Sequence, residues 1–148
     1  MEKTLVVIKP DGVKKGLQEE IKKRLTATGL RIVAEKEMQV DAAFASEHYD
    51  DLAERRGEDV KRRMVAFLSS GPVTAMIIQG DNAIGEVRRI TGNTEPISAD
   101  KGTIRGDLSG DSYAKSDAED RAVENLIHAS DSPETAAKEI KQWFPEIE

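Results

Sequence analysis

Residues 4–13 read TLVVIKPDGV, and this segment sets the architecture that we expect. Residues 5–8 form a continuous run of apolar, mostly β-branched side chains, which is typical of a strand buried on both faces. Pro10 cannot donate a hydrogen bond to a sheet and Gly12 favours a turn, so we expect the strand to end near Lys9. The segment therefore predicts a core strand that carries a lysine to the edge of a sheet.

The flanking segments predict an alternation of helices and strands. Leu17, Ile21 and Leu25 recur every four residues, which predicts an amphipathic helix that ends at Gly29. Residues 30–40 alternate apolar and polar side chains, as a strand with one solvated face does. This order predicts an α+β fold: a four-stranded, mainly antiparallel sheet with helices on one face, built on a split β-α-β pair. Further helices are expected at 42–54, 64–68, 82–90, 118–126 and from Pro133, a further strand at 73–78, and an irregular segment at 91–111.

The composition excludes several classes of protein. The chain has 148 residues, a length typical of one domain. It has no cysteine, which excludes disulfide scaffolds, cysteine nucleophiles and thiolate metal sites. Its 22 lysines and arginines against 28 acidic residues give a net charge of −6, which disfavours nucleic acids and anionic membranes as partners. A local cationic pocket is still compatible with this charge.

Signals for membrane insertion, secretion and common nucleotide or metal motifs are missing. The longest apolar runs, such as 75–78, are far too short to cross a bilayer. Residues 1–4 lack the apolar stretch of a signal peptide, so we expect a soluble, cytoplasmic protein. Residues 80–85 have the glycine spacing of a P-loop, but Glu86 and Val87 follow where Lys and Ser or Thr are needed. The two histidines are far apart in the chain, which disfavours a zinc site.

Three cations are candidates for binding phosphate. Lys9 follows the buried strand, at a sheet edge, although a lysine there can also extend its stem along the core to solvent. Arg105 stands between two glycines in GTIRGD at 102–107, where the backbone can approach a ligand closely and a guanidinium matches phosphate oxygens. Arg88 lies on a helix whose following loop holds Thr94. An ordinary surface turn is the alternative for Arg105, and a solvated charge is the alternative for Arg88.

The segment NLIHASDS at 125–132 is the most informative for chemistry. His128 follows an apolar pair and lies among small and hydroxyl residues just before a helix. A neutral imidazole is a nucleophile, and it is most useful when a carboxylate holds one ring nitrogen while the other faces the reactant. Glu139, on the helix that follows Ser132, is placed to supply that carboxylate. A lone histidine is more often structural, and we assign His48 to that class.

Taken together, these segments resemble the nucleoside diphosphate kinase family. The resemblance runs in order across nearly the whole chain, and an ordered set of motifs is far more specific than any one of them. It implies a ferredoxin-like α/β sandwich and a single domain of this family over residues 1–148. The matching segments are TLVVIKPDGV at 4–13, GL at 16–17, HY at 48–49, SGPV at 70–73, GNTEP at 92–96, GTIRGD at 102–107, NLIHASDS at 125–132 and EIKQWF at 139–144.

The resemblance also implies an activity. A phosphotransferase of this family moves the γ-phosphoryl group of a nucleoside triphosphate, typically ATP, to a nucleoside diphosphate by a ping-pong mechanism through a phosphohistidine. His128 falls on the phosphorylated position, and Ser130 and Glu139 fall on the residues that orient it. The nucleotide-site positions of the family fall on Lys9, Tyr49, Arg88, Thr94, Arg105 and Asn125.

Partners and alternatives follow from the same resemblance. We expect nucleoside di- and triphosphates as substrates, Mg²⁺ carried by the nucleotide without a protein metal ligand, and a homo-oligomer. The alternative is a nucleotide-binding regulatory module with little turnover. An RNA-binding module of similar fold would need exposed aromatic side chains, and the chain has three Phe, two Tyr and one Trp. We therefore expect no specific nucleic acid and no membrane as a partner.

Two segments depart from the family pattern. The family usually has a phenylalanine pair between the positions of Tyr49 and Ser70, and one of these rings stacks on the base. This chain has the charged segment 55–63 there, with Val60 as the nearest candidate base contact, although a valine cannot stack as an aromatic ring does. Residues 108–124 are longer than in the commonest members and rich in Asp, Ser and Glu. We expect this longer segment to reshape the rim of the pocket or a contact between subunits.

Overall fold

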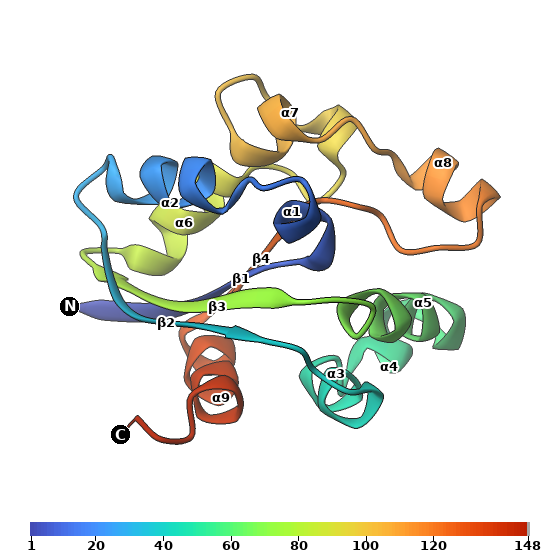
Figure 1. The fold of residues 1–148 in the computed structure, drawn as a ribbon, viewed down its shortest axis with the longest axis horizontal. Helices are drawn as coiled ribbons and strands as arrows, with labels where there is room; N and C mark the ends of the chain where they lie inside the picture. Colours follow the sequence, from blue (N-terminus) through green and yellow to red (C-terminus); the bar gives the residue numbers. More distant parts are fainter. Residues whose placement is uncertain (148) are drawn as a thin grey trace.

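Residues 1–147, which the structure describes, contain one antiparallel sheet of four strands. This computed structural model orders them β2-β3-β1-β4 (Figure 1). Along the chain the strands are β1 (Glu2–Ile8), β2 (Arg31–Met38), β3 (Val73–Gly80) and β4 (Ile127–Ala129). All three pairings are antiparallel, as the sequence predicted. Strand β1 therefore has a partner strand along each edge, and its apolar run is fully buried.

Nine α-helices and one 3₁₀ helix connect the strands within the described residues, and several are a single turn or two. Helices that pack on the sheet turn their apolar face toward it. They are α1 (Pro10–Lys14), α2 (Gln18–Thr26), α3 (Ala42–His48), α4 (Leu52–Arg56), α5 (Glu58–Leu68), α6 (Ala83–Thr91), η1 (Pro96–Ser98), α7 (Ile104–Leu108), α8 (Tyr113–Ala118) and α9 (Pro133–Trp143).

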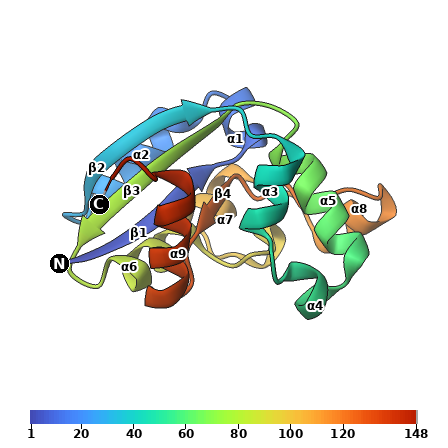
Figure 2. The ribbon, with the colours of Figure 1, turned by 90° about the horizontal axis from the view of Figure 1, so that it is seen from below.

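The sheet is covered on both faces, so the prediction of helices on one face was wrong. Val6 and Ile8 point into a core with α2, α6 and α7, whereas Leu5 and Val7 point into a second core with α3, α4, α5 and α9. Figure 1 shows α2 and α6 on one side of the sheet and α3 and α9 on the other, and Figure 2 shows the second side face-on. The physical reason lies in the strand itself, because consecutive apolar residues alternate between faces and each face then has to be buried.

Three of the predicted segments differ in the structure. The helix expected at 42–54 is two helices, because the chain turns at Tyr49–Asp51 between α3 and α4. The helix expected at 118–126 was wrong: α8 ends at Ala118, and Asp120 has a φ of 52°, a left-handed conformation that interrupts a helix. The irregular segment at 91–111 contains the short helices η1 and α7. These differences lie in connections, where periodicity carries little information.

The PDG segment brings the end of β1 next to the start of β4. The backbone N–H of Lys9 donates to the carbonyl of Leu126 at 2.8 Å, and the carboxylate of Asp11 accepts from the N–H of Leu126 at 3.0 Å. A Cβ at Gly12 would lie 2.8 Å from Cγ2 of Ile8 and 3.1 Å from the carbonyl oxygen of Leu126. Only glycine allows this approach. The turn thus places Lys9 next to the strand that carries His128, which pairs with Val7.

The described residues include no helix that is both long enough and apolar enough to cross a membrane.

Candidate active site

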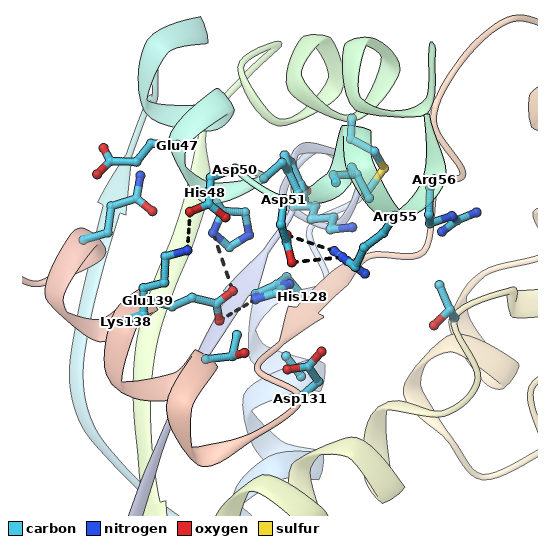
Figure 3. A pocket seen from close by; sticks show the side chains of 18 of the residues that line it. Glu47, His48, Asp50, Asp51, Arg55, Arg56, His128, Asp131, Lys138 and Glu139 are labelled. Carbon is cyan, nitrogen blue, oxygen red and sulfur yellow. Dashed lines mark hydrogen bonds and ion pairs between the residues drawn. The ribbon is translucent and has the colours of Figure 1, made fainter. Parts of the chain in front are cut away.

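One pocket gathers nearly all of the residues that the sequence singled out. It lies beside the end of β1 and beside β4, between α3–α5 on one side and the loops after α6 and before β4 on the other (Figure 3). Its lining includes Lys9, Tyr49, Arg88, Thr94, Arg105, Asn125, His128 and Glu139. Residues from opposite ends of the chain therefore converge, as the resemblance implied.

His128 is held by a carboxylate through one ring nitrogen only. Its Nε2 lies 2.9 Å from Oε1 of Glu139, and the hydroxyl of Ser130 donates to the same oxygen at 2.6 Å. A carboxylate accepts hydrogen bonds, so this contact fixes the tautomer of His128 with its proton on Nε2. The lone pair on Nδ1 is then available to a reactant in the pocket. The side chain of His128 is 20 % exposed, against 8 % for Glu139, which suits a reactive ring on a buried support.

The local sequence explains why Glu139 is in the right place. Ser132 caps α9 by accepting from the N–H of Thr135 at 3.1 Å, and Pro133 occupies the first turn. Ser130 is fully buried, and its hydroxyl accepts from the N–H of Leu5 at 3.3 Å. These contacts attach the segment before α9 to β1 and so fix the position of the helix against the sheet. Glu139 follows on the inner face of this helix, which confirms the predicted proximity of the carboxylate to His128.

His48 lies directly beside His128, a neighbour that the sequence analysis missed. The two rings are 4.5 Å apart between centroids and nearly perpendicular, at 82°. The indole N–H of Trp143 donates to Nδ1 of His48 at 3.0 Å, so His48 is a satisfied, buried residue. Burial, and then electrostatic repulsion between the two imidazoles, lower the pKa of His48 well below its usual value. The HY pair at 48–49 was the only signal in the sequence that could have placed His48 here.

The cluster of His48, His128 and Glu139 has the residue types of a metal site, but hydrogen bonds already engage its ligand atoms. Among the described residues, His48, His128 and Glu139 have ligand atoms that all lie within 4.8 Å of one another. However, Nδ1 of His48 already accepts from Trp143, and Oε1 of Glu139 accepts from both Ser130 and His128. A metal ligand needs a lone pair that no hydrogen bond uses. The arrangement is therefore better suited to orienting a nucleophilic imidazole than to holding an ion.

Lys9 is buried at the floor of the pocket. It is 3 % exposed, and its Nζ donates to Oδ1 of Asn125 at 3.0 Å. Burial, followed by repulsion from Arg105, lowers the pKa of Lys9 to about 7, although Asp11 opposes the shift. A buried amine with so few anionic partners is poised to receive a negatively charged ligand.

Arg105 is anchored by backbone carbonyls. Its Nε, Nη1 and Nη2 donate to the carbonyl oxygens of Asn125, Gly92 and Ile127 at 3.1, 3.1 and 2.6 Å. A guanidinium has five N–H groups, so two remain for a ligand. Burial, and then the nearby charge of Arg88, lower the pKa of Arg105 to about 10. These contacts make Arg105 a buried structural cation that also faces the pocket, rather than a residue of an ordinary surface turn.

The remaining predicted nucleotide residues are also present. Arg88 donates from Nη1 to the carbonyl of Ala129 at 3.2 Å, and Nδ2 of Asn125 donates to the carbonyl of Thr94 at 3.0 Å. The ring of Tyr49 packs edge-on against His48 at 4.7 Å, and burial raises the pKa of its hydroxyl. All of these residues line the pocket.

The structure does not bring Val60 into the pocket. Val60 is partly buried and packs against the core beneath α5, so the candidate base contact suggested by sequence does not face the site. The lining on this side consists instead of Leu52, Arg55, Arg56 and Met64. Sequence analysis noted the charge of this segment but could not tell which of its side chains turn inward.

An imidazole held by a carboxylate, next to three cations in a pocket, is an arrangement suited to phosphoryl transfer through a covalent intermediate. Comparison with known proteins agrees with this class. A family model described as nucleoside diphosphate kinase matches residues 2–148. The chain belongs to the nucleoside diphosphate kinase family.

Curated relatives and solved structures are similar over nearly the whole chain. The nucleoside diphosphate kinase of Listeria monocytogenes is 46% identical over 97% of this chain and 89% of its own length. That of Dehalococcoides mccartyi is 38% identical over 100% of this chain and 95% of its own. Among structures, a transition-state mimic of the Borrelia burgdorferi enzyme with bound vanadate and ADP has a TM-score of 0.94 and 40% identity, covering 97% of this chain and 86% of that one. An NDP kinase from Pyrobaculum aerophilum has a TM-score of 0.89 and 36% identity, covering 97% and 95%.

Proposed function

We propose that this chain transfers the γ-phosphoryl group of a nucleoside triphosphate to a nucleoside diphosphate through a phosphohistidine at His128. The observation that carries the mechanism is the contact of 2.9 Å between Nε2 of His128 and Glu139, which leaves Nδ1 free in a pocket lined by cations. Membership of the nucleoside diphosphate kinase family supports the substrates, because the curated relatives carry this activity in their names.

The reaction divides into two similar half-reactions. In the first, Nδ1 of His128 attacks the γ-phosphorus; the N–P bond forms while the bond to the oxygen bridging the β- and γ-phosphates breaks, and the diphosphate leaves with that oxygen. In the second, a terminal phosphate oxygen of the acceptor diphosphate attacks the phosphoryl group, and the electron pair of the N–P bond returns to Nδ1. The proton stays on Nε2 throughout. Glu139 stabilises the positive charge that the ring acquires.

The cations neutralise charge on the phosphates as they pass through the transition state. Phosphoryl transfer depends mainly on positioning and on electrostatic stabilisation, and both act strongly in a site that excludes water. Lys9 and Arg105 are 3 % and 7 % exposed, so their charges are little screened. Arg88 supplies a third charge at the same wall. Thr94, Tyr49 and Asn125 would orient the nucleotide, with Asn125 also holding Lys9.

Mg²⁺ enters this account as part of the substrate. A magnesium ion bridges phosphate oxygens and keeps most of its ligands as water, so it needs no cage of protein carboxylates. Three of the five pocket carboxylates are already engaged: Glu139 with His128, Asp51 with Arg55, and Asp50 with Lys138. The other two, Glu47 and Asp131, belong to no cluster of three potential metal ligands among the described residues. The donor set therefore fits a metal–nucleotide complex better than an ion held by the protein.

Single-domain organisation, a cytoplasmic location and self-association remain part of the proposal. The family model spans residues 2–148, which supports one domain. Strand β2 lies at an edge of the sheet, and Val33 on it is 41% exposed, as is expected where a second copy could pair or pack. Light scattering on the purified protein would measure the number of subunits.

Kinetics distinguish this function from a regulatory module with little turnover. With ATP labelled in the γ position, the protein alone should become labelled, and each added nucleoside diphosphate should remove the label. Initial rates against both substrates should give parallel double-reciprocal lines, as a ping-pong mechanism requires. Nucleotide binding without label would support the regulatory alternative, and the same labelling in His128→Ala would overturn the assignment of His128.

A further inference from the structure

The two segments that depart from the family pattern contact each other. The charged segment 55–63 covers the end of α4 and the start of α5, and α8 lies within the longer segment 108–124. Figures 1 and 2 both show α8 beside α5. Ion pairs join them: Arg62 with Asp120 at 2.9 Å, and Arg63 with Asp117 and Asp120 at 2.8 and 2.9 Å. The longer segment thus packs against α5, the helix whose first turns lie where the family usually has the phenylalanine pair.

Further contacts hold the two ends of the longer segment together. Arg121 donates to both carboxylate oxygens of Asp111 at 2.6 and 3.0 Å, and this pairing lowers the pKa of Asp111 to about 2. The N–H of Tyr113 donates to the carboxylate of Glu95 at 2.9 Å. Bidentate pairing of this kind fixes geometry as well as charge. Residues 111–121 therefore form a defined arm that presents Tyr113 at a fixed place.

Tyr113 contacts Arg56, a cation that lines the pocket, without lining the pocket itself. The guanidinium carbon of Arg56 lies 5.4 Å from the centroid of the Tyr113 ring, within the range of a cation–π contact. Arg56 lines the pocket and Tyr113 is not among the lining residues, so the ring holds the guanidinium from outside the cavity. Figure 3 shows Arg56 beyond Arg55 as seen from His128, at the outer part of the site.

Arg56 differs from its neighbour Arg55 in its partners. Arg55 pairs with both oxygens of Asp51 at 3.0 and 3.3 Å. No carboxylate of the described residues pairs with Arg56, and its contact is the aromatic ring. A guanidinium is planar and weakly hydrated, and it stacks on the faces of aromatic rings and of nucleobases. One cation at the outer part of the pocket is thus free to bind a flat, uncharged group.

We propose that Arg56, braced by Tyr113, is the residue that contacts the nucleobase in this chain, in place of an aromatic clamp. The inference rests on the proposed function, because it takes the phosphates to lie at Lys9 and Arg105 beside His128, and the base at the other end of the pocket. Every base presents a π-face, so a guanidinium stack accepts purines and pyrimidines alike. Arg56 is here a binding residue for the proposed reaction, and Tyr113 is a positioning residue.

A substrate without a base tests the proposal. The phosphoenzyme is formed with saturating labelled ATP, and its discharge is followed with ADP or with ribose 5-diphosphate. In Arg56→Ala the second-order rate constant for ADP should fall about tenfold, since stacking on one base is worth that much or more. The rate constant for ribose 5-diphosphate should stay within about twofold of the unaltered protein. Tyr113→Leu should show the same selective loss, to a smaller extent.

Two further variants separate stacking from charge. Arg56→Lys keeps the charge but loses the planar guanidinium, so it should behave like Arg56→Ala. Lys61→Ala removes a cation of α5 that is outside the pocket lining, and both rate constants should be unchanged. Equal losses with both acceptors in Arg56→Ala, no loss with either, or an unaffected Arg56→Lys would overturn the role of Arg56. Failure of the unaltered protein to form a phosphoenzyme would instead overturn the proposed function.

Discussion

The floor and the rim of the pocket are built on different physical principles. At the floor, Lys9, Arg105 and Glu139 are each less than a tenth exposed and held by fixed hydrogen-bond partners. At the rim, which here means Arg56 and the contacts of α5 with α8 behind it, Arg62 and Asp120 keep side-chain exposures of 56% and 63%, and their ion pair is open to solvent. Removing one member of a buried charged network is strongly destabilising, whereas an exposed ion pair contributes little to stability. The rim can therefore differ from the family pattern while the floor keeps it.

The largest effect should come from the support of His128. Replacing the carboxylate in Glu139→Gln keeps the shape but removes the charge that stabilises the ring, so phosphoenzyme formation should slow by about 10²-fold. Stopped-flow mixing with ATP would measure this rate. Glu134→Gln, in the exposed first turn of the same helix, is the matched control and should react normally. An undiminished rate in Glu139→Gln would mean that the floor does not act through this carboxylate.

The short helix α7, which holds Arg105, should be almost as sensitive. A Cβ at Gly106 would lie 2.0 Å from the carbonyl oxygen of Asp100, so Gly106→Ala must move the backbone. We expect the free energy of unfolding to fall by about 1–3 kcal/mol. We also expect the KM for the nucleotide to rise. Gly110→Ala provides the comparison, because a Cβ there meets nothing within 4 Å. Equal stability of the two variants in urea denaturation would show that this contact does not constrain α7.

Burial of Lys9 makes stability depend on pH. The pKa of Lys9 is lowered from 10.5 to about 7, so between these values the unfolded chain holds a proton that the folded protein has released. The contribution of Lys9 to the free energy of unfolding should therefore rise with pH from about 7 upward, by roughly 1 kcal/mol per pH unit. Denaturation of the unaltered protein and of Lys9→Met at pH 7, 8 and 9 measures this. A parallel pH dependence in the two would contradict a lowered pKa for the buried amine of Lys9.

The smallest effect should come from the ion pairs of the rim. Exposed pairs are worth about 0–1 kcal/mol each, so Asp117→Asn with Asp120→Asn should lower the free energy of unfolding by about 1 kcal/mol or less. The KM for a nucleoside diphosphate should rise a few-fold as Tyr113 loses its fixed position, and high salt should have the same effect on the unaltered protein. Discharge by ribose 5-diphosphate serves as the internal control. A loss of stability as large as that of Gly106→Ala would show that the rim is not peripheral.

The floor was predictable because short motifs specify it locally. The apolar run of β1 followed by Pro-Asp-Gly placed Lys9, and the spacing from Ser132 to Glu139 placed the carboxylate beside His128. The position of His48 could not be predicted, because its contact with His128 depends on how α3 packs against the sheet. The same applies to the second helical layer and to Arg56, since no periodicity tells which side chains of α4 and α5 face a cavity.

The most direct test of the central claim is to locate the phosphate. The protein is mixed briefly with ATP, kept alkaline because phosphohistidine is labile in acid, digested, and mapped by mass spectrometry. We predict one phosphoryl group on the peptide that contains His128, lost on addition of ADP and never formed in His128→Asn. Turnover without any phosphopeptide, or a phosphate carried by Ser130 in both proteins, would contradict the account.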